Sequence, residues 1–466
     1  MLFSTFDYFL FLPLVAVAHW LLGSTRTRSW LLLVASAVFY LAWNPSDTLV
    51  LFYVGAAGYL AAIAIERAKP EQRTALLSLA AVAMLAPLCF YKYAHFALDN
   101  VAVLIPGITP WVPPKGHLPI GISFYSFQAL AYVIDVRRGQ PRERDPVHYA
   151  TFLCFFPHLV AGPILRAHIL LGQLKQDRVL TRSDVGQGIW RLCVGLGKKL
   201  LIADVLQQGI VDTVFTDPAA FTGLEVLVAL YAYTLMMYAD FSGYTDFAIG
   251  SARLLGFHIP ENFDRPYQAT SVADYWRRWH KTLSDWVRDY VYYPLGGSRG
   301  GGLRPYVNTM VTLVILGVWH GANWTFVVYG VLHGCAVALN RWWRKRPGWT
   351  EPRGAGLAWR WLLTFQFVVI ARILFRSNDL GHAGEVATAL VSRWDEVSMP
   401  RYSLHAWAVM LAGYGIHFTP KHWAIHARDR FADLPAVAWG FGLAMLGWAC
   451  VHYGVGDSLA FIYYAF

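Results

Sequence analysis

Runs of apolar residues recur along nearly the whole chain and constrain its fold more than any other feature. A hydrophobic share of 56% against 15% charged residues leaves too little charge to cover a soluble protein, for which about a quarter is usual. This excludes a cytosolic enzyme, a disordered chain and a secreted scaffold. Runs long enough to cross a hydrocarbon core of about 30 Å lie near residues 8–22, 29–43, 47–65, 74–92, 147–171, 188–209, 222–239, 306–340, 358–374, 404–418 and 434–452.

These runs predict an all-α polytopic membrane protein with about 10–12 transmembrane helices in one membrane domain, residues 1–466. Basic residues lie in short clusters between the runs, which places alternate loops in the cytoplasm and the N-terminus outside. The net charge of +10 is thereby explained without a nucleic-acid partner. The clusters are Arg26 and Arg28; Arg67, Lys69 and Arg73; and Arg137, Arg138, Arg142 and Arg144.

Several kinds of chemistry have no motif in this sequence. The five cysteines show neither CxxC spacing nor clustering, so no zinc site or disulfide framework is predicted. The chain has no HExxH, P-loop or GxGxxG motif and no GxSxG nucleophile elbow between a strand and a helix, which excludes serine-nucleophile, zinc and ATP-driven mechanisms. His422 and His426 are four residues apart, but basic neighbours favour a solvated loop over a metal pair.

A charged, aromatic segment covers residues 261–304. It is too charged to face lipid, and spacings of three and four predict an amphipathic helix with one aromatic face. This helix lies at the membrane interface or folds into the protein, and a peripheral anchor is the alternative to a functional role. The aromatic face consists of Trp276, Trp279, Leu283, Trp286 and Tyr290.

The next segment is the opposite extreme, because no Asp, Glu, Lys or Arg occurs in the 36 residues between Arg304 and Arg341. A continuous helix of that length would measure about 54 Å, well beyond a bilayer core. We therefore predict a tilted, broken or partly re-entrant arrangement, since irregular backbone inside a membrane must be covered by protein or line a cavity. Gly317, Gly321 and Asn323 mark the expected break.

His320 lies near the middle of this uncharged segment. An ionisable side chain within the membrane is a functional candidate by default, and neutral imidazole is a competent general base. A histidine that only hydrogen-bonds a neighbouring helix is an equally good interpretation of the position. His280 lies among arginines on the amphipathic segment, where a solvated histidine is the favoured interpretation. The HxxxxD spacing of His280 and Asp285 is weak support for acyl transfer.

Two further groups have mainly structural interpretations. Asp240 and Asp246 follow an apolar run and can hold a cation, but we favour a role for Asp240 as a helix cap. His158, between Pro157 and Pro163, is expected to fix the backbone of a broken helix.

Taken together, an ordered series of motifs closely resembles the membrane-bound O-acyltransferase family, in its bacterial alginate O-acetyltransferase branch. The likeness runs nearly end to end, including residues 1–8 and 461–466, and is densest over 240–334. The motifs are residues 121–128, 155–163, 240–246, 276–280, 293–297 and 319–324.

The resemblance implies a funnel of transmembrane helices ringed by re-entrant and peripheral amphipathic helices, with N-terminal helices over 1–110, a catalytic core over 115–340 and C-terminal helices over 341–466. It assigns the principal catalytic histidine to His320 and the second to His280. It further implies a bacterial inner-membrane enzyme that takes an acyl group from a cytoplasmic thioester and delivers it to a hydroxyl, often through a periplasmic partner. The branch serves alginate, cellulose and other exopolysaccharides.

The residues themselves are compatible with this chemistry. Transfer of acetyl from a thioester to an alcohol needs a base and an oxyanion donor, which His320 can supply together with Asn323, Trp319 or Trp324. Acetyl-CoA carries several phosphate charges and needs a basic site. No tightly bound cofactor and no metal are expected. The residues that suit the donor are Arg277, Arg278, Lys281, Arg288 and Arg304, with Trp276 and Trp279 packing on its adenine or pantetheine.

Two alternatives stay open at this point. The same fold can transfer D-alanyl groups or acylate peptidoglycan. A proton-coupled transporter or flippase would use His320, Asp240 and Asp246 as a relay, although the sequence shows no internal inverted repeat of the kind common in transporters.

Overall fold

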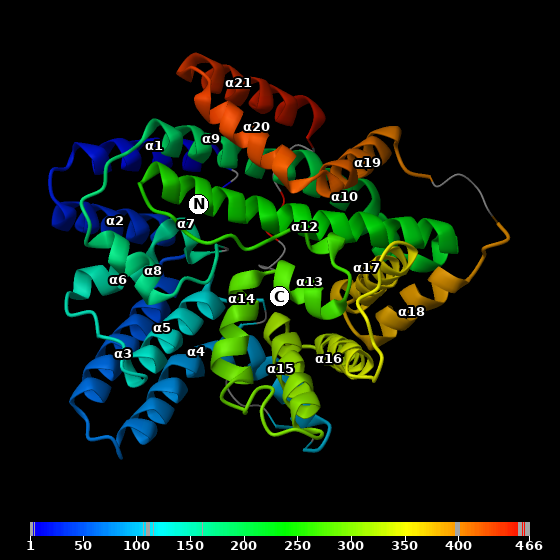
Figure 1. Cartoon of the computed structure of the whole chain (residues 1–466), viewed down its shortest axis with the longest axis horizontal. Helices are drawn as coiled ribbons and strands as arrows, with labels where there is room; N and C mark the ends of the chain where they lie inside the picture. Colours follow the sequence, from blue (N-terminus) through cyan, green and yellow to red (C-terminus); the bar gives the residue numbers. More distant parts are fainter. Residues whose placement is uncertain are drawn as a thin grey trace. The chain divides into compact units, whose positions relative to one another are not determined.

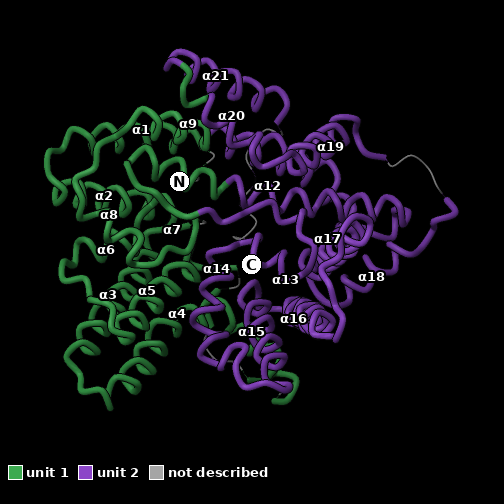
Figure 2. The backbone as a smooth tube through the Cα atoms, viewed as in Figure 1, with its two compact units in different colours: residues 1–192, 244–260, 431–434 green, residues 193–243, 261–430, 435–466 purple. Residues whose placement is uncertain are grey.

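The computed structural model of the chain describes residues 3, 5–105, 107–108, 112–114, 116–160, 162–396, 401–454, 459 and 461. Throughout this described part the secondary structure is helical and includes no strand (Figure 1), so the predicted all-α fold is confirmed. The Cα positions divide into two compact units (Figure 2), residues 1–192, 244–260 and 431–434 in one and residues 193–243, 261–430 and 435–466 in the other.

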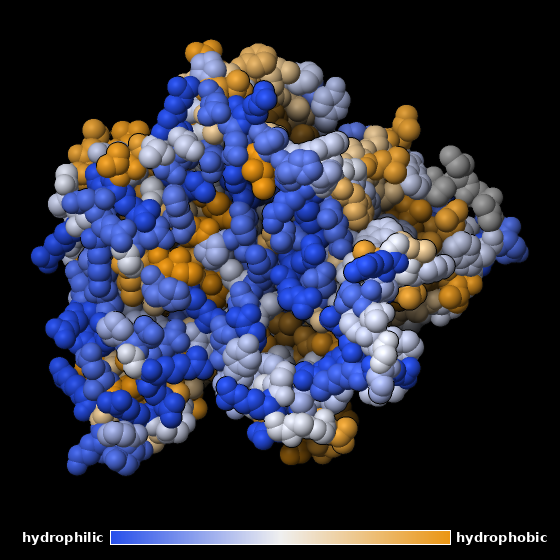
Figure 3. All heavy atoms as spheres, viewed as in Figure 1, coloured by the Kyte–Doolittle hydropathy of each residue, from blue (hydrophilic) through white to orange (hydrophobic). Residues whose placement is uncertain are grey.

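Five of the described helices are long and apolar enough to cross a bilayer, which makes the chain a multi-pass membrane protein. Large apolar side chains such as Phe52, Leu79 and Val437 are exposed, and apolar residues reach the surface over several helices in Figure 3. In a soluble protein such exposure would be an aggregation hazard, whereas lipid is its natural environment. The five helices are α3 (Asp47–Arg67), α4 (Arg73–Ala102), α12 (Gly223–Leu254), α17 (Ala355–Arg376) and α21 (Ala436–Tyr453). The estimate of ten to twelve spans stays a prediction.

The first unit contains one helix outside the predicted apolar runs, α5 (Ile122–Arg137), and lacks the single helix that was predicted over residues 147–171. The run at 147–171 is three short helices separated at Phe155 and by an extended stretch before Ala167, because Pro157 and Pro163 interrupt the backbone hydrogen bonding. His158 packs inside this broken region, as expected, with Nε2 3.3 Å from the Phe152 carbonyl. The further helices of this unit are α1 (Phe6–Leu21), α2 (Thr25–Leu41), α5 (Ile122–Arg137), α6 (Pro146–Cys154), α7 (Phe156–Leu159) and α8 (Ala167–Leu174).

The second unit holds most of the predicted site residues. Residues of α9 (Arg182–Leu196) and α12 belong to both units. A π-helical stretch, Gly197–Ala203, follows α9 and precedes α10 (Asp204–Leu206). The remaining helices are α11 (Asp212–Thr216), α13 (Val272–Arg278), α14 (Lys281–Val287), α15 (Arg304–His320), α16 (Trp324–Arg344), α17, α18 (Leu380–Val391), α19 (Leu404–Phe418), α20 (Lys421–Asp433, whose last residues belong to the first unit) and α21.

The charged aromatic segment is not one amphipathic helix. It breaks into α13 and α14 at His280, whose φ of 43° lies in the left-handed region and ends the helical hydrogen bonding. Its predicted aromatic face is nevertheless real: Trp276, Trp279, Leu283 and Trp286 are all buried within the protein. A peripheral anchor is therefore the wrong interpretation, and the segment is part of the core of its unit.

The uncharged segment forms a helical hairpin, which confirms the predicted break. Helix α15 ends at His320, residues 321–323 make the turn, and α16 begins at Trp324. The two helices pack closely because glycines face each other across the seam: a Cβ on Gly317 would lie 2.3 Å from the Phe326 carbonyl oxygen, and one on Gly330 would lie 2.6 Å from that of Leu313. Gly317 is thus a contact residue rather than a break.

We predict that Gly317→Ala lowers the stability of the protein in detergent by about 1–3 kcal/mol, because the added methyl group meets backbone atoms that cannot move independently. The measurement is the melting temperature followed by loss of monodisperse protein in size-exclusion chromatography. Gly384→Ala on α18 is the matched control, since its Cβ meets nothing within 4 Å and alanine favours a helix. Equal melting temperatures for the two variants would contradict the proposed contact.

Candidate active site

His320 lies at the tip of the α15–α16 hairpin, where the helix ends and the backbone turns. Its side chain is only 2% exposed and therefore does not face lipid. Aromatic rings surround the imidazole: Trp319 at 5.0 Å, Phe375 of α17 at 5.0 Å, Tyr329 at 6.3 Å and Phe326 at 6.4 Å between ring centroids. This apolar shell keeps water away from the one titratable group of the hairpin tip.

His280 is completely buried, so the favoured solvated interpretation was wrong. Its Nδ1 lies 3.0 Å from the Asn262 side-chain oxygen. That oxygen also accepts hydrogen bonds from the backbone N–H and the hydroxyl of Thr282, which fixes it as an acceptor. Nδ1 of His280 therefore donates its proton to Asn262, and Nε2 carries the lone pair.

One indole joins the two histidines. The ring of Trp319 lies 6.0 Å from that of His280 and 5.0 Å from that of His320. The strained backbone at His280 and the hairpin tip at His320 thus place two buried imidazoles against the same aromatic side chain. Sequence patterns could not predict this, since the two positions lie on separate helices joined by a long connection. Asp285, of the HxxxxD pattern, instead pairs with Arg288 at an exposed position.

The predicted donor-binding residues separate into two groups in the structure. Trp276 and Trp279 point into the core, and Trp276 donates from Nε1 to Nδ1 of His333 at 3.2 Å. Arg277 and Arg278 lie on the outer side of the same helix, where both pair with Asp274, at 3.3 and 2.9 Å. The tryptophans and the arginines therefore do not converge on one ligand surface. The side chain of Arg277 is nevertheless 66% exposed, so most of its N–H donors stay available to another partner.

Asn323 caps α16 with its side-chain oxygen, which accepts from the backbone N–H of Thr325 at 3.0 Å. Its amide nitrogen donates to the Asn378 carbonyl. Both ends of this side chain are thus used in holding the hairpin tip. Trp324 is half exposed, so of the three predicted oxyanion donors Trp319 has the closest contact with both imidazoles.

Asp240 lies in the interior of α12 and not at a helix start, so its predicted capping role is wrong. Lys199, from the π-helical stretch, bridges Asp240 and Asp204, with Nζ 2.8 Å from an oxygen of each. All three side chains are almost fully buried. Asp246 belongs to a different ion pair, with Arg191. The two acids that seemed a candidate cation pair therefore serve separate salt bridges, and the described residues contain no group of three metal ligands.

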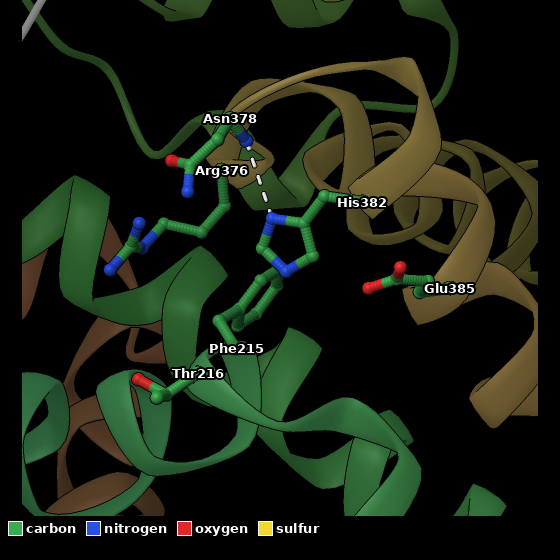
Figure 4. Close-up of a pocket in the computed structure, with 6 residues that line it drawn as sticks. All are labelled: Phe215, Thr216, Arg376, Asn378, His382 and Glu385. Atoms are coloured by element: carbon green, nitrogen blue, oxygen red, sulfur yellow. Dashed lines mark hydrogen bonds between the residues drawn. The ribbon is translucent and has the colours of Figure 1, made fainter.

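A polar cavity of about 380 Å³ opens beside the hairpin tip. Figure 4 shows its lining residues directed around a common space, with Asn378 donating from its backbone N–H to Nδ1 of His382. The cavity is linked to the site through Asn378, which holds Asn323, and through Arg376, which follows Phe375. Its lining consists of Phe215, Thr216, Arg376, Asn378, His382 and Glu385.

Sequence reasoning missed three buried polar residues of this region. Asn262 carries no motif signal. Lys199 lies within the apolar run 188–209 and belongs to none of the motifs described above. Arg372 lies within the apolar run 358–374. An ionisable residue in a membrane helix is a functional candidate, so this rule would have identified it.

The candidate site lies in a part of the chain that is similar to a known protein family. The profile of the membrane-bound O-acyltransferase family matches residues 119–375, a range that contains both buried histidines. A probable alginate O-acetylase of Pseudomonas syringae pv. tomato is 41% identical over 85% of this chain and 76% of its own length. A peptidoglycan O-acetyltransferase of Helicobacter pylori is 32% identical over 82% and 78%. A teichoic acid D-alanyltransferase of Bacillus subtilis is 26% identical over 59% and 72%.

The buried triad gives a prediction for stability. Lys199→Met leaves Asp204 and Asp240 buried without their cation, which costs about 3–5 kcal/mol, so the melting temperature in detergent should fall sharply. Lys198→Met, at the adjacent position, should change it little. The triple variant Lys199→Met, Asp204→Asn, Asp240→Asn should recover most of the loss, because it removes the charges together. A single variant as stable as the parent would contradict the assigned salt bridges.

Proposed function

The chain belongs to the membrane-bound O-acyltransferase family, and we propose that it transfers an acetyl group from cytoplasmic acetyl-CoA, across the bacterial inner membrane, to hydroxyls of an exported polysaccharide such as alginate. Its activity as an O-acyltransferase follows from the family match and from O-acetyltransferase relatives. The observation that carries the finer proposal is the pair of fully buried histidines against Trp319 within the matched range.

His320 acts as the general base in this proposal. The acceptor hydroxyl gives its proton to the imidazole while its oxygen attacks the thioester carbonyl carbon. The tetrahedral intermediate then collapses, the C–S bond breaks, and the leaving thiolate takes the proton back from the imidazolium. The products are the acetyl ester and free coenzyme A, with His320 restored. The aromatic shell at the hairpin tip supports this role, because excluding water prevents hydrolysis of the thioester.

Trp319 is the oxyanion donor that we favour, since its ring contacts both imidazoles and the amide of Asn323 is bonded to Asn378. His280 is a positioning residue in this account. Asn262 fixes its tautomer, and its ring packs on Trp319. This would hold the indole at a constant angle to His320.

The acetyl-CoA site is proposed on the cytoplasmic side. Basic residues gather at the ends of α16 and α17 that lie away from His320, among them Arg341, Arg344 and Arg353, and the positive-inside rule assigns that side to the cytoplasm. Arg277 and Arg278 add exposed or half-exposed guanidinium groups that suit phosphate.

An exported polysaccharide is the favoured acceptor because the Pseudomonas alginate O-acetylase is more similar to this chain than the Helicobacter peptidoglycan enzyme and the Bacillus teichoic acid enzyme, 41% against 32% and 26% identity. All three relatives are named for acyl transfer to a polymer of the cell exterior or envelope. The proposal includes a periplasmic partner that completes the transfer. The alternative is D-alanyl transfer by the same site.

We predict that His320→Ala lowers acetyl transfer from radiolabelled acetyl-CoA by purified protein in detergent by about 10²–10⁴-fold, the usual contribution of a general base. The protein should still elute as a single species. His422→Ala, on the exposed face of α20, is the matched control and should transfer at the parental rate. Parental activity in His320→Ala would remove this residue from the reaction.

A second prediction concerns the donor. Arg278→Glu should raise the KM for acetyl-CoA by about tenfold, through loss of a phosphate contact and repulsion by the new charge, with kcat and melting temperature near parental values. Arg393→Glu is matched to it, because it also breaks an exposed ion pair, with Glu396. A lower melting temperature with unchanged KM would show that Arg278 only pairs with Asp274.

A further inference from the structure

Arg372 is a buried cation about one turn from the C-terminal end of a candidate membrane span. It lies on α17, is 1% exposed, and among the residues that the structure describes no carboxylate pairs with it. A buried charge without a counter-charge is costly. A helix that only had to span or pack would be more stable with an apolar residue at this position.

The contacts of Arg372 satisfy only part of its guanidinium. One Nη donates to the Tyr275 hydroxyl at 2.8 Å, the guanidinium also bonds the Tyr267 hydroxyl, and Cζ lies 4.9 Å from the Trp279 ring and 5.5 Å from the Phe375 ring. Nε is buried and has no acceptor. Cation–π contacts offset some of the desolvation of a guanidinium, but they leave this N–H unused.

His333 of α16 supplies a second unused donor in the same cluster of aromatic side chains, since Tyr275 contacts both His333 and Arg372. Its Nδ1 accepts from the indole N–H of Trp276, which can only donate. The proton of the neutral ring is therefore on Nε2, and that atom is buried without a partner. The nearby Tyr233 hydroxyl is likewise buried and unbonded. Orphaned buried donors of this kind are rare in proteins and call for an explanation.

These groups share one chemical character. Arg372 Nε and His333 Nε2 are donors, the guanidinium is positive, and Tyr233 can donate as well. His333 and Tyr233 both lie within electrostatic range of Arg372, and charge-assisted donors gathered in this way suit an oxygen atom with negative charge. A purely structural cluster would include an acceptor for each donor.

The residues around Arg372 adjoin the proposed reaction centre. The Phe375 ring contacts both, 5.5 Å from the guanidinium of Arg372 and 5.0 Å from the His320 ring, and Tyr329 contacts the rings of both His320 and His333. A group held by Arg372 would therefore sit one aromatic ring away from the catalytic imidazole.

We propose that Arg372, with His333 and Tyr233, binds a carboxylate or phosphate group of a substrate and positions that substrate at His320. The inference rests on the proposed function and names a determinant of its specificity. The anionic group has two possible sources with the same chemistry, a phosphate of coenzyme A or a carboxylate of an acidic sugar acceptor.

The test is a binding measurement that needs no turnover. Calorimetry on the full chain in detergent compares coenzyme A and a short oligouronate as probes, with the parent, Arg372→Met and Arg372→Lys. We expect a loss of affinity of about tenfold or more in both variants for one of the probes, since lysine keeps the charge but not the planar geometry. Arg393→Met, which removes an exposed guanidinium paired with Glu396, is the control and should bind as the parent does.

The probe that loses affinity identifies the source of the anionic group. Unchanged affinity for both probes in Arg372→Lys, or no binding of either probe to the parent, would overturn the proposal. The melting temperature gives a second readout: Arg372→Met should be at least as stable as the parent in the absence of ligand, whereas a structural cation would make it less stable. Binding is measured here without catalysis. If His320 proves not to be catalytic, the proposed function fails, but the binding result for Arg372 can still be interpreted.

Discussion

The close approach of two helices determines what the active region can be. Helices α15 and α16 touch through backbone at Gly317 and Gly330, where any side chain would collide with a carbonyl oxygen of the opposite helix. This contact lets the uncharged segment fold back on itself, so that its first helix, α15, ends at His320. Without it, His320 would lie on the side of a helix rather than at a turn covered by aromatic rings.

A second constraint works from the opposite side of the cluster. His280 occupies a left-handed backbone conformation that breaks the charged aromatic segment into two helices, and Asn262 holds its ring. Such strain at a non-glycine residue persists only where the surroundings determine it, and it is common at functional sites. The break turns Trp276 and Trp279 inward and leaves Arg277 and Arg278 outside, so one short helix contributes to both the core and the basic surface.

The fold class was predictable from the sequence, because membrane burial leaves a strong signal in apolar runs and charge clusters. The break in the 36-residue uncharged segment was also predictable, since helix length and bilayer thickness are fixed quantities. Residue roles were predicted wrongly where side-chain partners decide the outcome. Asp240 was expected to cap a helix, but it pairs with Lys199. Lys199 lies 41 positions earlier in the chain, and no local pattern links the two residues.

The candidate site was predictable only in part for the same reason. His320 was identified from its position among uncharged residues, while His280 gained its functional assignment from resemblance and was otherwise expected to be solvated. Arg372 was overlooked inside an apolar run. Residues 1, 2, 4 and 462–466, which contributed to the resemblance at the two ends of the chain, lie outside the described residues.

The central claim is that the thioester reaches His320 inside the aromatic shell of the hairpin tip. The most direct test is an experimental structure of the protein with a thioether analogue of acetyl-CoA that cannot transfer its acyl group. The account predicts the sulfur and the adjoining carbonyl carbon close to the His320 imidazole, with room for an acceptor oxygen at about 3–3.5 Å from that carbon. An analogue bound with its reactive end elsewhere, and His320 still enclosed by Trp319, Phe326 and Phe375, would contradict it.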